Sequence, residues 1–557
     1  MIFFKKRPPF ILLTKKIIGA SLGNCVHVGG VVNFLELAEQ QGYDTFFLGP
    51  AVSVEELIGA VIETNPDIIA VGYRLTPNNA EMLFDGLKSE MEKFDLVDKQ
   101  LFFGGTQPTA EVARKSGLFD IIFDGTENID QIIGFLKGGS SINELQDNAD
   151  NLVDRIESKY PHPIIRHHLG LPDLDETVEG VKRLAESQVL DVISIAPDQN
   201  AQEYFFQQDK MDKALDGAGG VPLRTKKDFL RLYEATKNGN YPLMRCYSGT
   251  NDVFKMANIL LKTINNAWAA VPLCWYNVLD GRGPRKVVDS IRENQELMKW
   301  HGNRNVPLEV NEAHHWSLRD AHDTIAVVMA YLAAYNAKKM GIKHYIAQYM
   351  FNTPPGTSPQ MDLAKMLAKI ELIESLEDKS FKTFRQARAG LSSFPSDLDL
   401  AKGHLASSVY LAMAIRPHIY HVVAYCEAHF AATPKEIIES CKIARGVIRS
   451  SLSGFPNMIN DKQVQLRKDE LVSEANILLD AIKSLDVSSE DPLTNPNVLA
   501  KAIEIGLLDA PHLRGNKWAK GKLQTRIKDG ACFAYDVESG TVINETDRIK
   551  KLVNITG

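Results

Sequence analysis

The sequence lacks the features that define several classes of protein. Its 557 residues include only six cysteines, scattered without a C-x-x-C pair, which excludes a disulfide framework and a thiolate zinc site. No run of about 18 apolar residues occurs, so no transmembrane helix is expected. Positive charge is not in excess, since the formal net charge is -7, and this argues against nucleic acid or an anionic membrane as the partner.

The first residues, MIFFKKRPPFILLTKK, combine basic and apolar residues as a signal peptide does. Their apolar pieces are short and are interrupted by KKRPP and KK, and no small-residue cleavage site follows. We therefore expect no export, a cytoplasmic protein and reduced thiols.

An alternating series of apolar and helical segments runs from residue 17 to about residue 137. The candidate strands are IIGASL, TFFLGP, DIIAVGY, QLFFGG and FDIIFDG, with helical stretches between them. Short apolar strands separated by helices are typical of a parallel sheet that is covered on both faces. The pattern predicts an α/β, doubly wound, flavodoxin-like domain over residues 1–138. A stretch rich in Gly, Ser, Asn and Asp predicts a linker over 139–185.

A second alternating series follows, with the candidate strands DVISIAP, YPLMRCYSG, AWAAVPLCWYN, VPLEVNEAHH, KHYIAQYMF and HIYHVVAYCE. Six or more βα units in about 260 residues favour a closed (β/α)8 barrel of the TIM type over a second open sheet. We assign this barrel to residues 186–485. Residues 486–557 are predicted to form a small C-terminal cap.

Ligands bind beyond the carboxyl ends of parallel strands in both kinds of sheet. In the first domain these ends carry the loops GNCVHVGG, GYRLTP and GGTQPT. In the second they carry hydrogen-bonding and aromatic side chains: Asp198, Gln199, Asn200, Arg245, Tyr247, Thr250, Trp275, Tyr276, Asn277, Asn311, Glu312, His314, His315, Gln348, Tyr349, Asn352, Glu427 and His429.

His27 lies between two valines, and a lone histidine in such a place is usually a packing residue. Here, however, Gly30 follows it by three positions, 42 residues separate Gly30 from Tyr73, and 28 residues separate Leu75 from the pair Gly104–Gly105. This arrangement resembles the cobalamin-binding domain of B12-dependent mutases and methionine synthase, whose pattern is D-x-H-x-x-G, then S-x-L, then G-G.

The resemblance implies adenosylcobalamin as the cofactor and His27 as the cobalt ligand, in place of the benzimidazole tail of the cofactor. Imidazole is a good ligand for transition metals. Gly104 and Gly105 would lie where that tail passes close to the backbone and a Cβ atom would obstruct it. Gly30 and Leu75, which fill the other positions of the pattern, are also predicted to bind the cofactor. Two positions depart from the family: Cys25 stands at the aspartate that orients the histidine, and the serine is replaced by Tyr73, or by Gly72 if the loop shifts by one residue.

The barrel carries a second resemblance. YPLMRCYSGTND is similar to the R-H-G-T-P-D segment of the large subunit of glutamate (methylaspartate) mutase. PLCWYNVLDGRGPRKVVDSIRENQELM resembles its S-Y-N-I-P-Y segment and following helix, and GLLDAPHLRGN its D-I-P-F-containing C-terminus. Together the resemblances imply a fused radical isomerase acting on a small carboxylated substrate, with amino acids among the candidates.

Candidate catalytic residues come from the same resemblance. Arg245 falls on the family arginine that grips a substrate carboxylate, and Glu312, Tyr349 or Glu371 would serve as amino-group partner or general base. QYMFNTPPGTSPQ replaces the family's G-Y-G-x-x-G-N segment, so the substrate stays open. His314, His315 and His322 do not have the spacing of a zinc site.

Two other functions stay open. A corrinoid-dependent methyltransferase would need a four-helix module before the cobalamin domain, and only about 16 residues precede the first strand, so the mutase is preferred over it. A non-catalytic cobalamin sensor or carrier would hardly need a barrel with a polar rim. We expect the protein to form a homo-oligomer, in particular a dimer. We also expect it to bind a small-molecule substrate and to bind neither nucleic acid nor a membrane.

Overall fold

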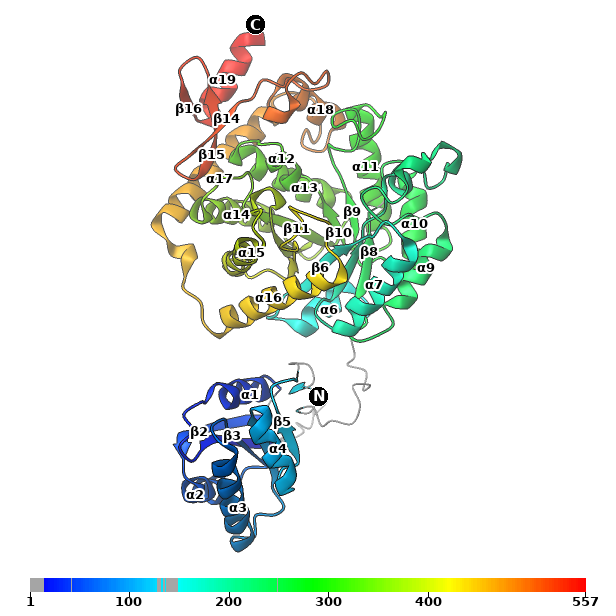
Figure 1. Ribbon diagram of the computed structural model, residues 1–557. Coiled ribbons are helices and arrows are strands. Elements are labelled where there is room, and N and C mark those ends of the chain that lie inside the picture. The colour runs from blue at the N-terminus through cyan, green and yellow to red at the C-terminus, as the bar shows by residue number, and fades with distance from the viewer. Residues whose placement is uncertain are drawn as a thin grey trace, which may run out of the picture. The chain divides into compact units, whose positions relative to one another are not determined.

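The computed structural model describes residues 15–41, 43–127, 132–133, 136, 149–247 and 249–556. It divides the chain into two compact units, Met1–Leu145 and Gln146–Gly557, shown in Figure 1. The first 14 residues, which bear on export, and residues 139–148 of the predicted linker lie outside the described residues. Within the described ranges, no helix combines the length and apolarity needed to cross a membrane.

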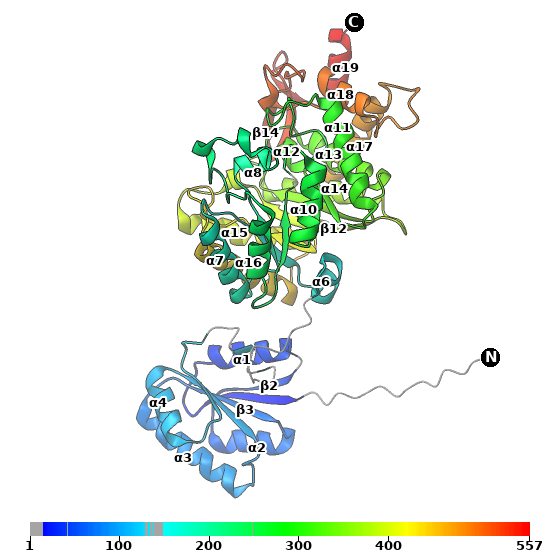
Figure 2. The same ribbon diagram turned by 90° about the vertical axis from the view of Figure 1, so that its right-hand side faces the viewer.

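The N-terminal unit contains one five-stranded parallel sheet with strand order β2-β1-β3-β4-β5. Helix α1 covers one face, and α2, α3 and α4 cover the other, as the two separate cores and Figure 2 show. The predicted doubly wound, parallel sheet is confirmed. Its elements are β1 Lys16–Leu22, α1 Gly29–Gln40, β2 Asp44–Val52, α2 Val54–Thr64, β3 Ile68–Tyr73, α3 Pro77–Lys93, β4 Gln100–Gly105, α4 Gln107–Ser116 and β5 Ile121–Phe123.

The second unit is built on eight parallel strands in the order β8-β7-β6-β13-β12-β11-β10-β9. No ladder joins β8 to β9 among the described residues, so the barrel is nearly closed. The predicted parallel barrel is confirmed to this extent. The strands are β6 Ile164–Leu169, β7 Val192–Ile195, β8 Leu243–Cys246, β9 Ala269–Val271, β10 Leu308–Val310, β11 His344–Phe351, β12 Lys382–Ala389 and β13 Ile419–His421.

Two of these strands were missed by the sequence analysis. β6 reads IIRHHL and β12 reads KTFRQARA, and charged residues in a short segment do not suggest a buried strand. The linker was therefore predicted too long: helix α6 (Leu152–Lys159), β6 and α7 (Leu174–Ser187) belong to the second unit. The segment VPLEVNEAHH was also predicted as one strand, but β10 ends at Val310 and a short helix, α12 (Ala313–Ser317), follows.

Helices surround the barrel (Figure 1). α13 and α14 are buried on nearly all sides, because α17 packs over both of them. Such helices are apolar around most of their circumference, as IAVVMAYLAA in α13 illustrates. The helices are α9 Lys226–Ala235, α10 Val253–Thr263, α11 Val287–Gly302, α13 Asp323–Lys339, α14 Pro359–Glu374, α15 Leu398–Met413, α16 Pro434–Ser453 and α17 Lys462–Lys483.

The C-terminal cap contains helix α18 (Pro496–Ile505), an antiparallel sheet of β14 (Thr525–Lys528), β15 (Ala531–Asp536) and β16 (Thr541–Ile543), and α19 (Glu545–Thr556). Buried polar contacts fix it to the barrel helices. Asp323, the first residue of α13, accepts a hydrogen bond from the backbone N–H of Cys532 at 3.0 Å and pairs with Lys365 and Arg467, each at 3.3 Å. The cap is therefore an integral part of the second unit.

Candidate functional site

Apolar side chains close the amino-terminal end of the barrel. Ile164, Leu243 and Phe384 belong to one buried cluster with Trp268 and with Leu152 of α6. Side chains alternate between the two faces of a strand, so the residues two positions further along β6, β8 and β12 also point into the barrel. Because the floor is filled, a ligand can enter only from the carboxyl ends of the strands.

An ionic layer lies directly above this floor. Its four members come from alternate strands, which is how side-chain layers fill a barrel of this kind: Arg166 from β6, Arg245 from β8, Glu309 from β10 and Gln386 from β12. Glu309 is the centre of the layer. It accepts hydrogen bonds from Arg245 at 2.8 Å, Trp268 at 2.9 Å and Gln386 at 3.0 Å, and Arg166 lies 4.0 Å away.

The ionic layer carries more positive than negative charge. Arg166 and Arg245 are each 2% exposed or less, and Glu309 is the carboxylate with which both pair. The Nε and Nη1 atoms of both arginines have no hydrogen-bond partner within the described part of the chain. Buried cationic groups of this kind are expensive to leave unpaired, and they favour an anion in the space above them.

The next layer toward the mouth contains His168, Tyr247, His421 and Arg388. The Tyr247 hydroxyl lies 3.0 Å from Nε2 of His168, and His421 Nδ1 lies 3.0 Å from a guanidinium nitrogen of Arg166. Burial, followed by the charge of Arg388, lowers the pKa of His168 to about 3 and that of His421 well below its usual value. Both imidazoles are therefore neutral near pH 7.

Arg388 is the most accessible cation of the barrel interior. It lies two positions after Gln386 on β12, points into the barrel by alternation, and is partly exposed. Its Nε donates to the carbonyl of Ala389 at 3.3 Å, and it forms no ion pair among the described residues. An arginine held in this way presents a planar donor fork to a carboxylate.

The predicted catalytic residues lie in different places. Arg245 is in the ionic layer. Glu312 lies just beyond β10 and is fully buried, where it accepts the backbone N–H groups of Leu273 and Cys274 and the indole N–H of Trp316. Burial raises the pKa of Glu312 to about 7. The carboxylate thus holds the loop after β9 at the rim of the barrel.

Tyr349 and Glu371 are not in the barrel interior, so both predictions are corrected. On β11 the inward position belongs to Gln348, which bonds Asn311 at 3.0 Å, so Tyr349 points outward toward the helices. Glu371 is exposed near the end of α14, where it pairs with Lys468 of α17 at 2.7 Å. Because α14 begins beside the carboxyl end of β11 and runs back along the barrel, Glu371 lies far from the mouth.

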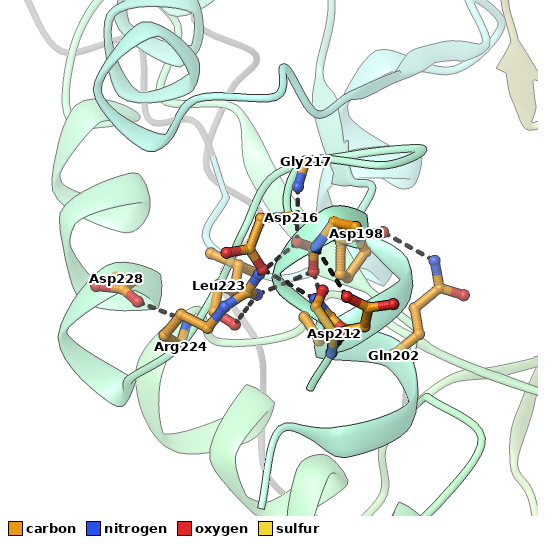
Figure 3. A network of polar contacts seen from close by, with 12 residues as sticks. Asp198, Gln202, Asp212, Asp216, Gly217, Leu223, Arg224 and Asp228 are labelled. Atoms are coloured by element: carbon orange, nitrogen blue, oxygen red, sulfur yellow. Dashed lines mark hydrogen bonds and ion pairs between the residues drawn. The ribbon is translucent and has the colours of Figure 1, made fainter. Parts of the chain in front are cut away.

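Histidines and aspartates at the rim have mainly structural contacts. His314 and His315 lie on α12 with ring centroids 4.6 Å apart, and not at the end of the strand predicted for VPLEVNEAHH. Asp198, after β7, forms a two-point ion pair with Arg224, at 3.0 and 2.6 Å, that also engages Asp216 (Figure 3). This network organises the long insertion between β7 and α9. Within the described residues, no cluster of histidine, cysteine and acidic residues could hold a metal ion.

The N-terminal unit places His27 on an exposed loop between β1 and α1. The buried thiol of Cys25 lies with its Sγ atom 3.7 Å from the His27 Nδ1 atom. The cysteine therefore occupies the position beside the imidazole ring that the resemblance gives to an aspartate. Leu75, at the end of β3, is also exposed.

A row of small residues crosses three neighbouring strands at the same edge of this sheet. Ser21 of β1 is the register partner of Gly72 on β3, which is the partner of Gly104 on β4. All three lie on the face covered by α1, since a Cβ atom on Gly72 would meet Val31 of α1 at 2.7 Å. A Cβ atom on Gly104 would meet no described residue within 4 Å, and the same holds for Gly30.

Two predicted cofactor residues do not share this open position. Gly105 is on the opposite face, where a Cβ atom would lie 2.4 Å from the Thr109 hydroxyl, so this glycine serves the packing of β4 against α4. Tyr73 is also on that face and is fully buried, with its hydroxyl 3.4 Å from the Asn24 side chain. The small residue on the α1 face of β3 is therefore Gly72.

Comparison with known proteins identifies the first unit. Residues 15–133 match the family model of the B12 binding domain, so this unit is a B12-binding domain. No curated protein matches the chain.

Two solved structures are similar to parts of the chain. A novel cobalamin-binding protein from Desulfitobacterium hafniense DCB-2 is 26% identical over 23% of this chain and 59% of its own, with a TM-score of 0.20. The cobalamin-dependent S-adenosylmethionine radical enzyme OxsB is 10% identical over 84% of this chain and 56% of its own, with a TM-score of 0.21. The chain thus spans less than two thirds of the length of either protein.

Most residues of the barrel interior were not predicted from the sequence pattern. Arg166 and His168 lie on β6, Gln386 and Arg388 lie on β12, and neither segment was predicted as a strand. One signal was available in the sequence. Arg166 and His168 are two positions apart, as are Gln386 and Arg388, and residues at this spacing lie on the same face of a strand.

Proposed function

We propose that this protein is an adenosylcobalamin-dependent carbon-skeleton mutase that acts on a small carboxylated substrate. The observation that carries the proposal is the excess of positive charge in a barrel whose floor is closed. Arg388 is partly exposed at the mouth and forms no ion pair with a described residue, and Arg166 and Arg245 below it share one carboxylate. A carboxylate-bearing substrate would supply the missing negative charge.

The B12-binding domain has the features that a corrin with a displaced tail requires. His27 would hold the cobalt, with its ring steadied by the Cys25 thiol. The tail of the cofactor would lie along Ser21, Gly72 and Gly104, where no side chain fills the space beside Gly104. Bound adenosylcobalamin would supply a carbon radical able to remove a hydrogen atom from substrate.

The barrel residues would bind and confine the substrate. Arg388 would grip one carboxylate through two N–H groups. His168 and His421 are neutral, so they can donate or accept hydrogen bonds without adding charge. Glu309 acts from below by holding Arg245 and Arg166 in place, and the apolar floor excludes water from that side.

The proposal is tested by anaerobic reconstitution of the full chain with adenosylcobalamin. Displacement of the benzimidazole tail changes the absorption spectrum, and a panel of mono- and dicarboxylic acids and amino acids is then added. We expect one carboxylated compound to produce a cob(II)alamin absorption and electron paramagnetic resonance signal and to be isomerised.

Other outcomes overturn the proposal in distinguishable ways. Binding of methylcobalamin with transfer of its methyl group, and no radical signal, would make the protein a methyltransferase. Tight binding with no reaction of any carboxylate would favour a sensor or carrier. The homodimer is a separate proposal, which light scattering after size-exclusion chromatography tests directly.

A further inference from the structure

One short segment of the cap has a charge unlike that of the rest of the chain. Residues 511–528, PHLRGNKWAKGKLQTRIK, contain six basic residues and no acidic one, whereas the whole chain has a formal net charge of -7. None of the six forms an ion pair in the part of the chain that the structure describes. They are Arg514, Lys517, Lys520, Lys522, Arg526 and Lys528.

Buried hydrogen bonds give this basic segment a defined shape. The carboxylate of Asp509, which is 1% exposed, accepts the backbone N–H groups of Lys522 at 2.9 Å, Leu523 at 3.0 Å and Gly521 at 3.2 Å. Three N–H donors on one carboxylate hold the loop to the end of α18. The positive charge is therefore presented on an ordered backbone.

The segment forms one wall of a groove of about 450 Å³. The opposite wall is the loop after β11 together with the turn before α13. Two hydrogen bonds hold the walls together: the Thr525 hydroxyl donates to the carbonyl of Asp320 at 2.8 Å, and the Ser358 N–H donates to the carbonyl of Gly530 at 2.8 Å. The dimensions of the groove are thus set by the fold of the second unit.

The lining combines an aliphatic floor with two arginines. Pro354, Pro355 and Ile527 contribute apolar surface, and Arg514 and Arg526 contribute charge. Arg526 lies over the ring of Tyr535, with its guanidinium carbon 4.0 Å from the ring centroid, which orients the side chain. Both arginines are exposed and free of carboxylate partners among the described residues.

The acidic side chain in the lining is already engaged. Asp320 has its carboxylate 3.1 Å from the Nε2 atom of His512. Its single negative charge is outnumbered by the two positive charges of Arg514 and Arg526. The groove keeps a positive balance, and the four lysines of the segment reinforce it.

We propose that this groove is a second ligand site, which binds a small molecule carrying phosphate groups. Two arginine forks suit phosphate oxygens, and the prolines and Ile527 would contact an apolar part of the same ligand. The volume lies in the range of small-molecule pockets. Single-stranded nucleic acid is a poorer fit, because such surfaces stack bases on aromatic side chains and the described lining has none.

The test is isothermal titration calorimetry of the full chain at about 0.15 M salt, where weak surface electrostatics are screened. The probes are inorganic tripolyphosphate, ATP and uncharged adenosine. We expect saturable binding of one ATP per chain and no binding of adenosine. Arg514→Gln and Arg526→Gln should each weaken ATP binding by about tenfold or more, which corresponds to the loss of one charged contact.

The matched control is Lys501→Gln, which removes an exposed positive charge on α18 outside the groove lining. It should leave ATP binding unchanged, and all three variants should unfold at the temperature of the parent protein because the altered side chains are exposed. Equal ATP affinity in the parent and both arginine variants would overturn the proposal. So would the absence of saturable binding, or an affinity for oligodeoxythymidine that grows with its length while ATP does not bind.

The proposal for this groove and the proposed mutase function can be overturned independently of each other. Binding of ATP that depends on Arg514 and Arg526 would stand even if no carboxylate gives a radical signal. Conversely, an active mutase with no phosphate binding would overturn only the second site.

Discussion

The two units use the same end of a parallel sheet in opposite ways. In the B12-binding domain the carboxyl ends of β1, β3 and β4 leave open space beside Gly104 and offer one exposed imidazole, His27. In the barrel, buried charge gathers around Glu309, and Arg388 lies nearer the carboxyl ends and is partly exposed. In the proposed function, the first unit would make room for the cofactor and the second would supply the charge that binds a small substrate.

The largest effect is expected from removing Glu309, the carboxylate that balances the positive charge of the ionic layer. Glu309→Ala leaves Arg166 and Arg245 buried without a carboxylate, so it should lower the free energy of unfolding by about 3–5 kcal/mol. The measurement is urea unfolding of the full chain. Glu371→Ala is the control. Because this carboxylate is exposed, its removal should lower the free energy of unfolding by less than about 0.5 kcal/mol. Equal losses in the two variants would show that Glu309 does not balance the layer.

The next effect separates substrate binding from cofactor binding. Arg388→Met removes the accessible guanidinium and keeps much of its volume, so kcat/KM for the carboxylated substrate should fall by about 10²–10³-fold. Cobalamin affinity should not change, because the residue belongs to the barrel unit. Stability should change little, since Arg388 forms no ion pair within the described ranges. Unchanged kcat/KM would remove Arg388 from the site.

Substitutions at two adjacent glycines, Gly104 and Gly105, test the row of small residues in the B12-binding domain. Gly104→Val places side-chain atoms in open space, so it should weaken cobalamin binding by about 10²-fold without unfolding the unit. Gly105→Ala should instead destabilise the unit by about 1–3 kcal/mol, because its Cβ atom would lie 2.4 Å from the Thr109 hydroxyl. Cobalamin titration and thermal unfolding distinguish the two. Identical behaviour would mean that the faces of β4 are wrongly assigned.

The barrel should be acid-sensitive because it buries neutral histidines. His301 on α11 is 1% exposed, and burial lowers its pKa from 6.5 to about 4. The unfolded chain then binds more protons than the folded chain, so the stabilisation is complete above pH 6.5 and declines as the pH falls toward 4. For each such histidine, the free energy of unfolding should fall by about 2 kcal/mol when the pH is lowered from 7 to 5.

Urea unfolding at these two pH values, compared with His301→Phe, checks this prediction. The variant should be less sensitive to acid than the parent. His429→Ala, at an exposed position, should keep the sensitivity of the parent. A parent protein equally stable at pH 5 and pH 7 would contradict the assignment.

The smallest effect concerns the unusual partner of His27. His27→Ala should weaken cobalamin binding by about tenfold and restore the spectrum of the cofactor with its own base coordinated. Cys25→Asp should strengthen the ligation, because a carboxylate polarises an imidazole more than a thiol does. If His27→Ala changes neither affinity nor spectrum, the histidine is not the cobalt ligand.

The sequence predicted the site of the first unit better than that of the second. His27, Gly30 and Gly104 follow one another at spacings set by the strands, and local patterns preserve such spacings. The barrel site is assembled from β6, β8, β10 and β12, which span more than two hundred residues. Arg166 and Arg388 were missed because charged residues in short segments suggest loops, and only closure of the barrel brings both side chains into its interior.

Residue order alone determined that this chain has two α/β units, that the first carries a glycine-lined edge with a histidine loop, and that the second is built from repeated βα units. Those features depend on local apolar periodicity, which the chain carries whether folded or not. Only the tertiary structure decided which face each glycine occupies, that Tyr349 and Glu371 point away from the barrel interior, and that three arginines converge there. The reason is that strand register and barrel closure bring together side chains from distant segments, and no local pattern contains that information.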